Sequence, residues 1–450
     1  MPRLALPTMA AQLVDLLYNL TDRVFIGHIP DGAGLALTGV GVCLPIVLVV
    51  SSFGMFAGSG GAPLASVALG EGKGAEANRV VGNVLALIIL FAICMMVTLG
   101  LTMDFLLPFF GASTATFPYA QSYLAIYLAG TPFVMGSLAF NAILLAQGDS
   151  RLALWSVGLG AVLNIILDAL LIFFLLLGVQ GAALATVMSE AANAITAFAF
   201  LRRKSSVLRP QLRYLRLDGA HVKSILALGS APFFITTSEA LMIVVFNGTL
   251  LAYGGDVYVG AMVVLQAFSQ MFFSVSNGFT RGVQPIISYG YGAGCYERVR
   301  RAAKATIVTT TALVAVIVCL VIAFSGFFAS LFSSDEAIRG LVVQMTPVYC
   351  CVFVLFGIQT GMQTVFMGLK QGLCSLSVAA ARKIVFMIPL AFALPHFVGA
   401  WGVFLAEPIS DACSITFCSI LFAWRIPKIL EGPEDEKRGS AYSSPHGGRA

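Results

Sequence analysis

Long apolar runs dominate the pattern of hydrophobic and polar positions along this chain. A helix that crosses a bilayer needs about 20 mostly apolar residues, and runs of that length recur between breaks of glycine, proline and charged residues. They predict an all-α polytopic membrane protein with twelve transmembrane helices. Their approximate bounds are 4–28, 35–58, 80–107, 118–146, 152–177, 180–201, 222–253, 258–289, 302–332, 340–368, 374–396 and 399–424.

The basic residues sort strongly between the two sides that these helices define. With both termini in the cytoplasm, 21 of the 26 Lys and Arg fall on the inner side, and the outer loops hold only Arg339. Such asymmetry is typical of multi-pass membrane proteins. We therefore expect a protein of the cell (inner) membrane with both termini cytoplasmic. Because Met1 stands almost directly against the first helix, we expect a short leader or an upstream start before it.

Composition supports the same class of protein. Of the 450 residues, 58% are apolar and 10% are charged, whereas soluble domains carry about 25% charged residues. With a mean hydropathy of +0.92, a soluble enzyme is excluded. The net charge of +5 then reflects topology rather than nucleic-acid binding. The nine cysteines and four histidines are too scattered to predict disulfides or a metal site, so we expect no cofactor.

The second half of the chain repeats the first. A shift of 222 residues superposes the pattern G-x-x-P-x-x-S-x-x-x-G-x-G at 60–72 on the same pattern at 282–294. A shift of 221 residues superposes 178–189 on 399–410. Two blocks at nearly one offset indicate a duplicated unit rather than chance matches.

Each half contains six of the predicted helices, so the repeat is parallel. The predicted organisation is an N-terminal six-helix lobe at 1–205, a basic cytoplasmic linker at 206–221, a C-terminal six-helix lobe at 222–425 and a disordered cytoplasmic tail at 426–450. Two pseudo-symmetric lobes around a central cleft are typical of transporters, which bind substrate between the repeats near the midplane. Such a cleft needs no second copy, so we expect a monomer.

Apart from Asp104 near the end of the third helix, seven carboxylates fall within the predicted membrane helices. On insertion scales each charge near a helix centre costs roughly 2.5–3.5 kcal/mol, so acids are retained there where they face water, a partner or cargo. The seven are Asp15, Asp22, Asp168, Glu190, Glu239, Glu407 and Asp411.

Polar residues of the first half form stripes on three helices. At spacings of three or four residues, the stripes are Asp15, Asn19 and Asp22 on the first helix, Asn164 and Asp168 on the fifth, and Thr186, Glu190 and Asn193 on the sixth. If the stripes converge, they form a chamber of carboxylate, amide and hydroxyl oxygens that suits H+ or a small hard cation such as Na+. The alternative is hydrogen bonding between helices.

The second half offers fewer candidates. Glu239 is the only acid of the seventh helix, and it either contacts a cationic substrate or pairs with Arg281. We predict substrate binding by Glu239, Asn19, Met242 and Gln284, although a methionine in such a helix is also typical of simple packing.

Two acids of the twelfth helix have a more structural interpretation. Glu407 and Asp411 are one turn apart, and the eleventh helix carries Arg382 and Lys383. A charge inside the membrane is usually paired. We therefore expect these acids to offset the two cations.

The order and spacing of several motifs resemble multidrug and toxic compound extrusion (MATE) transporters, in the branch of MepA-like and DinF-like proteins. The matching segments include Leu17-Tyr18-Asn19-x-x-Asp22, Asn164-x-x-x-Asp168, Gly282-x-Gln284-Pro285 and Arg382-Lys383-x-Val385-Phe386-x-Ile388-Pro389. The similarity extends over essentially the whole chain except the tail.

The resemblance implies an antiporter, not an enzyme, that exports organic cations and drugs by alternating access, coupled to H+ or Na+. It implies a coupling-cation site at Asp22, Asn164, Asp168 and Thr186, with Na+ a candidate at Asp22 and Asp168. The family often has an amide where this sequence has Asp15, so a third carboxylate leaves the choice of ion open. The NorM-like branch adds acids on the tenth helix, and this chain has glutamines there.

Two other functions are weaker predictions. A lipid-linked oligosaccharide flippase of the same superfamily needs a strongly cationic cleft, and acids outnumber basic residues inside these helices. A membrane-embedded enzyme needs acids at helix–loop junctions, a His/Cys metal set or a Ser/His pair, and the sequence shows none.

Overall fold

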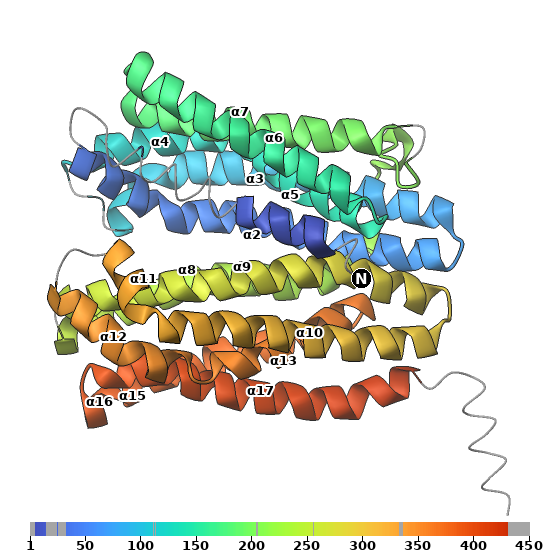
Figure 1. Cartoon of the computed structure of the whole chain (residues 1–450). Helices are drawn as coiled ribbons and strands as arrows, with labels where there is room; N and C mark the ends of the chain where they lie inside the picture. The colour runs from blue at the N-terminus through green and yellow to red at the C-terminus, as the bar shows by residue number, and fades with distance from the viewer. Residues whose placement is uncertain are drawn as a thin grey trace, which may run out of the picture.

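The chain folds into helices joined by short turns, as Figure 1 shows for the computed structural model. The structure describes residues 5–14, 25, 33–110, 112, 114–203, 206–254, 256–332 and 336–430. In order, the helices are Ala5–Val14, α2 (Ala33–Gly70), α3 (Gly74–Phe109), α4 (Phe117–Ala129), α5 (Thr131–Ala146), α6 (Ser150–Asp168), η1 (Ala169–Phe174), α7 (Gly178–Leu201), η2 (Leu212–Tyr214), α8 (Gly219–Gly254), α9 (Asp256–Gly292), α10 (Tyr296–Ala323), α11 (Ser325–Phe332), α12 (Glu336–Cys350), α13 (Phe353–Gly368), α14 (Gly372–Ala380), η3 (Ala381–Met387), α15 (Ile388–Ala393), α16 (Pro395–Val398) and α17 (Trp401–Leu430).

These helices follow the predicted spans in order. Within the described residues, seven helices are long and apolar enough to cross a membrane, and two bent pairs bring the number to nine. Helices α8 and α9, with 36 and 37 residues, also have the length to cross. The helix Ala5–Val14 is the described part of the first span. The predicted all-α polytopic fold is confirmed, and the order of its helices fits twelve spans.

The two halves break their helices at equivalent places. The fourth span of each half is a bent pair: α4 and α5 meet at 54°, and α12 and α13 meet at 49°. The fifth span of each half contains a π-helical segment, η1 in the first half and η3 in the second. Pro132 at the start of α5 lacks a backbone donor, which explains why the helix restarts there. The structure therefore repeats irregularities as well as helices.

Several helices extend beyond the predicted spans. Helix α2 continues to Gly70, so most of the repeated pattern at 60–72 is helical rather than a loop. The tight turns come just afterwards, at Gly72 and Gly294, whose φ angles of 75° and 70° favour glycine. Residues 426–430, assigned to the tail above, instead continue α17, and Leu430 is buried. The remainder of the predicted tail lies outside the described residues.

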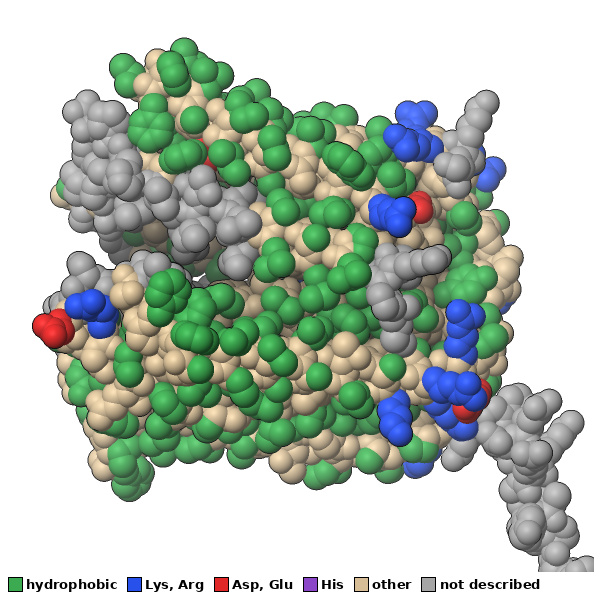
Figure 2. Space-filling view, in the orientation of Figure 1, with side chains coloured by type: hydrophobic (Ala, Val, Ile, Leu, Met, Phe, Trp, Pro, Cys, Tyr) green, Lys and Arg blue, Asp and Glu red, His purple; other side chains and the backbone are tan. Residues whose placement is uncertain are grey.

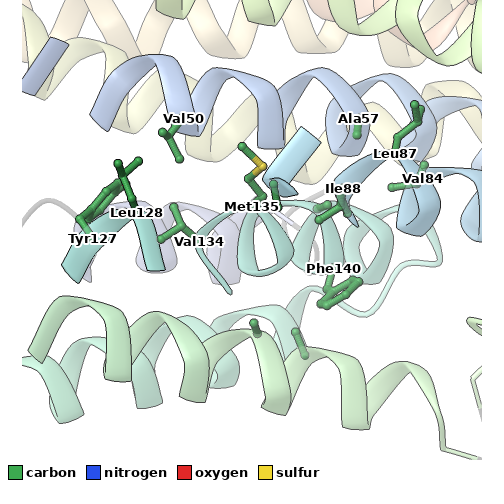
Figure 3. Packing of buried hydrophobic residues seen from close by; sticks show 14 of the residues in the cluster. Val50, Ala57, Val84, Leu87, Ile88, Tyr127, Leu128, Val134, Met135 and Phe140 are labelled. Carbon is green, nitrogen blue, oxygen red and sulfur yellow. The ribbon is translucent and has the colours of Figure 1, made fainter. Parts of the chain in front are cut away.

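Helices α2 to α7 form one bundle and α8 to α17 the other (Figure 1). Figure 3 shows the core of the first bundle, where Val50 and Ala57 of α2 lie near Met135 of α5 and Leu87 of α3. Apolar residues cover the outer sides of both bundles, and Lys and Arg gather at one end of the helices (Figure 2). We call this end the basic end.

The two bundles touch backbone to backbone where α2 crosses α8 and α9. A Cβ added at any of four glycines would lie within 2.2 Å of a carbonyl oxygen of the other half. These glycines are Gly60, Gly70, Gly229 and Gly292. Small residues permit close approach of helices in membranes. The repeated pattern therefore specifies the contact between the halves.

Side chains add a few contacts between the halves. The Thr8 hydroxyl donates to the carbonyl oxygen of Gly278 at 2.6 Å, and the Thr237 hydroxyl donates to the Ser52 hydroxyl at 3.2 Å. The Phe233 ring of α8 lies 4.8 Å from the Phe56 ring of α2, between centroids. None of these contacts is an ion pair.

The segment between the two halves is packed onto the first bundle. Three amide side chains accept hydrogen bonds from its backbone: Gln147 from Leu208 at 3.0 Å, Asn78 from Arg209 at 2.7 Å and Asn83 from Asp218 at 2.8 Å. The short helix η2 covers Gly82 of α3, where a Cβ would lie 2.4 Å from Tyr214 Cβ. The described linker is thus a fixed part of the basic end.

His221 joins α3 to the start of α8 at the edge of this segment. Its Nε2 lies 2.7 Å from Glu76 Oε1, and its Nδ1 lies 2.8 Å from Asp218 Oδ2. Burial lowers the pKa of His221, but the hydrogen bonds and charges of Glu76 and Asp218 outweigh it, so the pKa lies above its usual 6.5. The imidazolium therefore bridges two carboxylates.

Substituting Gly229→Ala should destabilise this arrangement of the halves. The added Cβ would lie 1.9 Å from the Phe56 oxygen, and overpacking of this kind costs about 1–3 kcal/mol. We expect a lower thermal unfolding temperature of the purified protein. Gly158→Ala is the matched control, because nothing lies within 4 Å of its Cβ position. Equal unfolding temperatures for the two variants would contradict the close crossing.

The His221 bridge should also make stability depend on pH. A histidine whose pKa is raised on folding stabilises the protein fully below its unfolded pKa, near 6.5, and loses this contribution as pH rises through the folded value. The gap in unfolding temperature between the native protein and His221→Gln should therefore shrink from pH 6 to pH 8.5. The Glu76→Gln variant should narrow the gap already at pH 6. A gap that grows with pH would show that His221 is held neutral.

Candidate functional site

The structure describes two of the three polar stripes of the first half. Asp15, Asn19 and Asp22 lie outside the described residues, so the stripe on the first helix is not placed. Asn164 and Asp168 lie on α6, and Thr186 lies on α7.

Helices α6 and α7 bring these three residues to one level. Gly160 of α6 packs against Ser189 and Asn193, and Gly181 of α7 packs against Leu171. The two helices are therefore antiparallel neighbours, with Asn164, Asp168 and Thr186 between these two contacts. The predicted convergence of the fifth and sixth helices thus occurs in the described part of the site.

Asn164 and Asp168 are completely enclosed. Their side chains are 1% and 0% exposed. Neither polar atom of the Asn164 amide has a hydrogen-bond partner among the described residues, and a buried amide without partners costs about 1–3 kcal/mol. The Thr186 hydroxyl donates to the Ala182 carbonyl at 3.0 Å, which leaves its oxygen lone pairs able to accept or coordinate. The donor set consists of a carboxylate, an amide and a hydroxyl.

Asp168 also marks an irregularity of the helix. It is the last residue of α6, directly before the π-helical segment η1. Single π-helical turns inside α-helices are frequent at functional sites. Because hydrogen bonds in a π-helical turn join residues five apart instead of four, the register of the backbone groups after Asp168 is shifted by one residue.

Glu190 and Asn193 belong to a separate polar network. The Ser137 hydroxyl donates to Glu190 Oε2 at 2.5 Å, Asn141 Nδ2 donates to Asn193 Oδ1 at 2.9 Å, and the Ser156 hydroxyl donates to Asn141 Oδ1 at 2.6 Å. For these two residues the alternative of hydrogen bonding between helices fits the structure. Sequence analysis missed Ser137 and Asn141, because a single Ser or Asn in an apolar helix carries no periodic signal.

A buried charge cluster occupies the second bundle. Arg382 Nε donates to Asp411 Oδ1 at 2.5 Å, and its Nη2 lies 3.3 Å from Glu407 Oε1. The Tyr349 hydroxyl donates to Glu407 Oε2 at 2.9 Å, and the guanidinium carbon lies 4.6 Å from the Phe356 ring centroid. The predicted offset is confirmed for Arg382. Sequence analysis missed Tyr349.

Lys383 and Glu239 complete this cluster. Lys383 is 8% exposed, and its Nζ lies 3.8 Å from the Met387 sulfur. No carboxylate of the described residues lies within ion-pair distance of that Nζ. Glu239 interacts electrostatically with Lys383 and Arg382, its cationic neighbours. It therefore faces the cations of the eleventh span, and no ion pair joins it to Arg281.

Two other candidate substrate residues, Met242 and Gln284, are buried or half-buried. Met242, one turn after Glu239 on α8, is 4% exposed and belongs to the hydrophobic core of the second bundle. Gln284 is half-buried near the basic end of α9, beside Pro285, whose carbonyl accepts a hydrogen bond from Ser66. Its place favours a role at the contact between the halves, and the position of Met242 favours packing.

Removing the Arg382 guanidinium from the buried charge cluster should lower the stability of the protein. Arg382→Met leaves Asp411 and Glu407 buried together, and breaking a buried ion pair costs about 3–5 kcal/mol. We expect a large loss of folded yield and of thermal stability in detergent. Adding Glu407→Gln and Asp411→Asn should recover most of it. Arg425→Met, at an exposed position on Trp424, is the control, and similar losses in both single variants would refute the pairing.

Comparison with known proteins shows the family to which this chain belongs. The MatE family model matches residues 7–170 and again 232–393, once in each half and over well more than half of the chain. The chain is 26% identical to the multidrug export protein MepA of Staphylococcus haemolyticus over 94% of this chain and 93% of that one. It is 23% identical to an FAD transporter of Shewanella oneidensis, over 91% and 90%.

Solved structures agree on the fold. One described as the outward-facing conformation of a multidrug resistance MATE family transporter superposes with a TM-score of 0.89, at 22% identity, covering 95% of this chain and 96% of that chain. A transporter of the same superfamily from Pyrococcus furiosus also gives 0.89. The predicted fold, with two pseudo-symmetric six-helix lobes, is that of these transporters. The chain is a member of the MatE family.

Proposed function

We propose that this protein exports organic cations, including drugs, across the cell membrane in exchange for H+ or Na+. The observation that carries the proposal is the enclosed pair of Asn164 and Asp168 at the level of Thr186. Similar proteins named as multidrug exporters support the choice of cargo. The protein then acts by moving solutes, not as an enzyme, and a monomer suffices.

The orientation follows from charge. Lys and Arg gather at the basic end (Figure 2), and such loops stay in the cytoplasm. We assign the basic end to the cytoplasm, with both termini on that side. The glycine contacts of α2 with α8 and α9 lie toward this end, which fits an outward-facing state whose cytoplasmic side is closed.

In this proposal, drug export is coupled to the binding of H+ or Na+ at Asp168. A proton removes the negative charge of Asp168, and Na+ held by its carboxylate with the oxygens of Asn164 and Thr186 offsets that charge and coordinates the amide oxygen. Asp22 and Asp15 are further ligands in this proposal. Because ion and drug must prefer different states of the transporter, ion entry from outside shifts the equilibrium toward drug release and then the inward-facing state. Pro7 of the first span supplies a flexible point for this change.

A lipid-linked oligosaccharide flippase is not favoured. Such a protein needs a strongly cationic cleft, whereas Asp411, Glu407 and Glu239 surround the buried cations Arg382 and Lys383. The relatives compared above are named as exporters and transporters of small molecules.

Substituting Asp168→Asn should abolish export while leaving insertion intact. The amide keeps the shape of the side chain but cannot bind a proton or offer a full charge to Na+. We expect loss of efflux of a fluorescent cation from proteoliposomes, with unchanged yield and elution profile. Asp104→Asn, at an exposed carboxylate of α3, should transport normally. Full transport by the Asp168 variant would remove the proposed site.

The same vesicles identify the ion. Separately imposed pH and Na+ gradients should show that one of them drives efflux of the native protein. Neither gradient should drive Asp168→Asn. If the native protein moves the fluorescent cation against the concentration gradient of that cation with neither a pH gradient nor a Na+ gradient imposed, the coupling proposed here is wrong.

A further inference from the structure

A cavity at the basic end is outside the transport site described above. It has a volume of about 410 Å³ and opens to the outside between α3, the linker and the start of α8. Its basic lining residues are Arg79, Arg213, Arg216 and His221, with Asp218 as the acidic one. We propose that this cavity binds the phosphate group of an anionic phospholipid of the cytoplasmic leaflet. The choice of leaflet rests on the orientation proposed above.

The charges of the cavity favour an anion. Arg213 is exposed, with its guanidinium carbon 4.5 Å from the Tyr214 ring centroid. Neither Arg213 nor Arg216 has a carboxylate within ion-pair distance among the described residues. Guanidinium groups bind phosphate through paired hydrogen bonds. The cavity thus has two arginines available for a ligand.

The acid of the cavity is already engaged. Asp218 Oδ1 accepts the Ala220 backbone N–H at 3.0 Å, capping α8, and its other oxygen lies 2.8 Å from His221 Nδ1. Glu76, which faces the opposite nitrogen of His221, lies 3.7 Å from Arg79. These pairs leave an excess of positive charge from Arg213 and Arg216. Asp218 therefore does not cancel the attraction for phosphate.

The position of Arg79 connects the cavity to lipid. Arg79 lies on the same face of α3 as Leu90, Ile93 and Val97, because these residues follow it at helical spacing. The three apolar side chains are 50%, 57% and 56% exposed. A lipid whose phosphate lies at Arg79 can therefore extend its acyl chains along this face. Basic pockets on the cytoplasmic side of membrane proteins bind anionic headgroups in this way.

The cavity is a product of the linker, which occurs once in the chain. The repeat of 222 residues pairs Arg79 with Arg301 in the second half. Arg301 is 80% exposed and pairs with Glu297 at 3.0 Å. No described segment equivalent to 206–218 covers it. The second half therefore supplies an internal control with a similar charge and no cavity.

The test uses the purified full-length chain in nanodiscs of phosphatidylcholine, with phosphatidylglycerol as the probe. Retention of phosphatidylglycerol is measured by native mass spectrometry after release from the nanodisc. The variant Arg79→Gln, Arg213→Gln, Arg216→Gln should retain it roughly a hundredfold more weakly, from the loss of three surface cations. The control Arg298→Gln, Arg301→Gln, Lys304→Gln removes the same charge from the second half and should bind as the native protein does.

A competition experiment and the comparison of the two triple variants decide between a lipid site and its alternatives. Glycerol phosphate, which has the same headgroup chemistry without acyl chains, should compete only weakly; full competition would assign the cavity to soluble phosphates and overturn the lipid proposal. Equal loss in both triple variants would show a general surface field rather than a site. Unfolding temperatures in pure phosphatidylcholine verify that both variants fold. Because binding is measured without transport, failure of the export proposal leaves this result unaffected.

Discussion

The free-energy cost of a charge in hydrocarbon governs this molecule more than any other constraint. The two bundles meet that cost differently. In the second, Arg382, Asp411 and Glu407 pair within one enclosed cluster. In the first, Asn164 and Asp168 are fully buried, and the described residues leave the Asn164 amide without partners. The second bundle pairs its cation Arg382 within the protein, whereas the first leaves an amide that the ion of the proposed mechanism would coordinate.

This difference has arisen within a duplicated framework. The bends of the fourth spans and the π-helical segments of the fifth spans recur in both halves. In the first half the π-helical segment follows Asp168, and in the second it contains Arg382 and Lys383. The same backbone irregularity therefore carries an acid in one half and cations in the other. Duplication fixed the geometry, and side-chain substitution then gave each half its own electrostatics.

The sequence predicted most of the fold because apolar length is sufficient to define a membrane helix. It missed the extension of α2 to Gly70, because Gly60, Gly61 and Pro63 predict a break, whereas the helix continues through them. It predicted a site at Asn164, Asp168 and Thr186, and the structure places these residues on two neighbouring helices.

Other polar contacts outside the candidate site depend on tertiary packing that no spacing reveals. Ser137 and Asn141 acquire their role only because α5 packs on α7. The docking of the linker likewise rests on Asn78 and Asn83, two ordinary amides of α3 that meet the linker backbone only after folding.

The alternating access proposed above requires a contact between the halves that is specific and can also open. The crossing of α2 with α8 and α9 is specific, since backbone carbonyls meet glycines where no other residue fits. It also buries apolar area, because Phe233 of α8 packs on Phe56 of α2. Among the described residues, two ion pairs join the halves at the basic end: Glu71 with Lys370 at 3.8 Å and Glu76 with His221 at 2.7 Å. Glu71 and Lys370 are both partly exposed, and exposed pairs contribute at most about 1 kcal/mol. Strong interactions remain within each bundle, at Arg382 and around Asn141. In the mechanism proposed above, the two bundles separate at the basic end when an ion binds at Asp168.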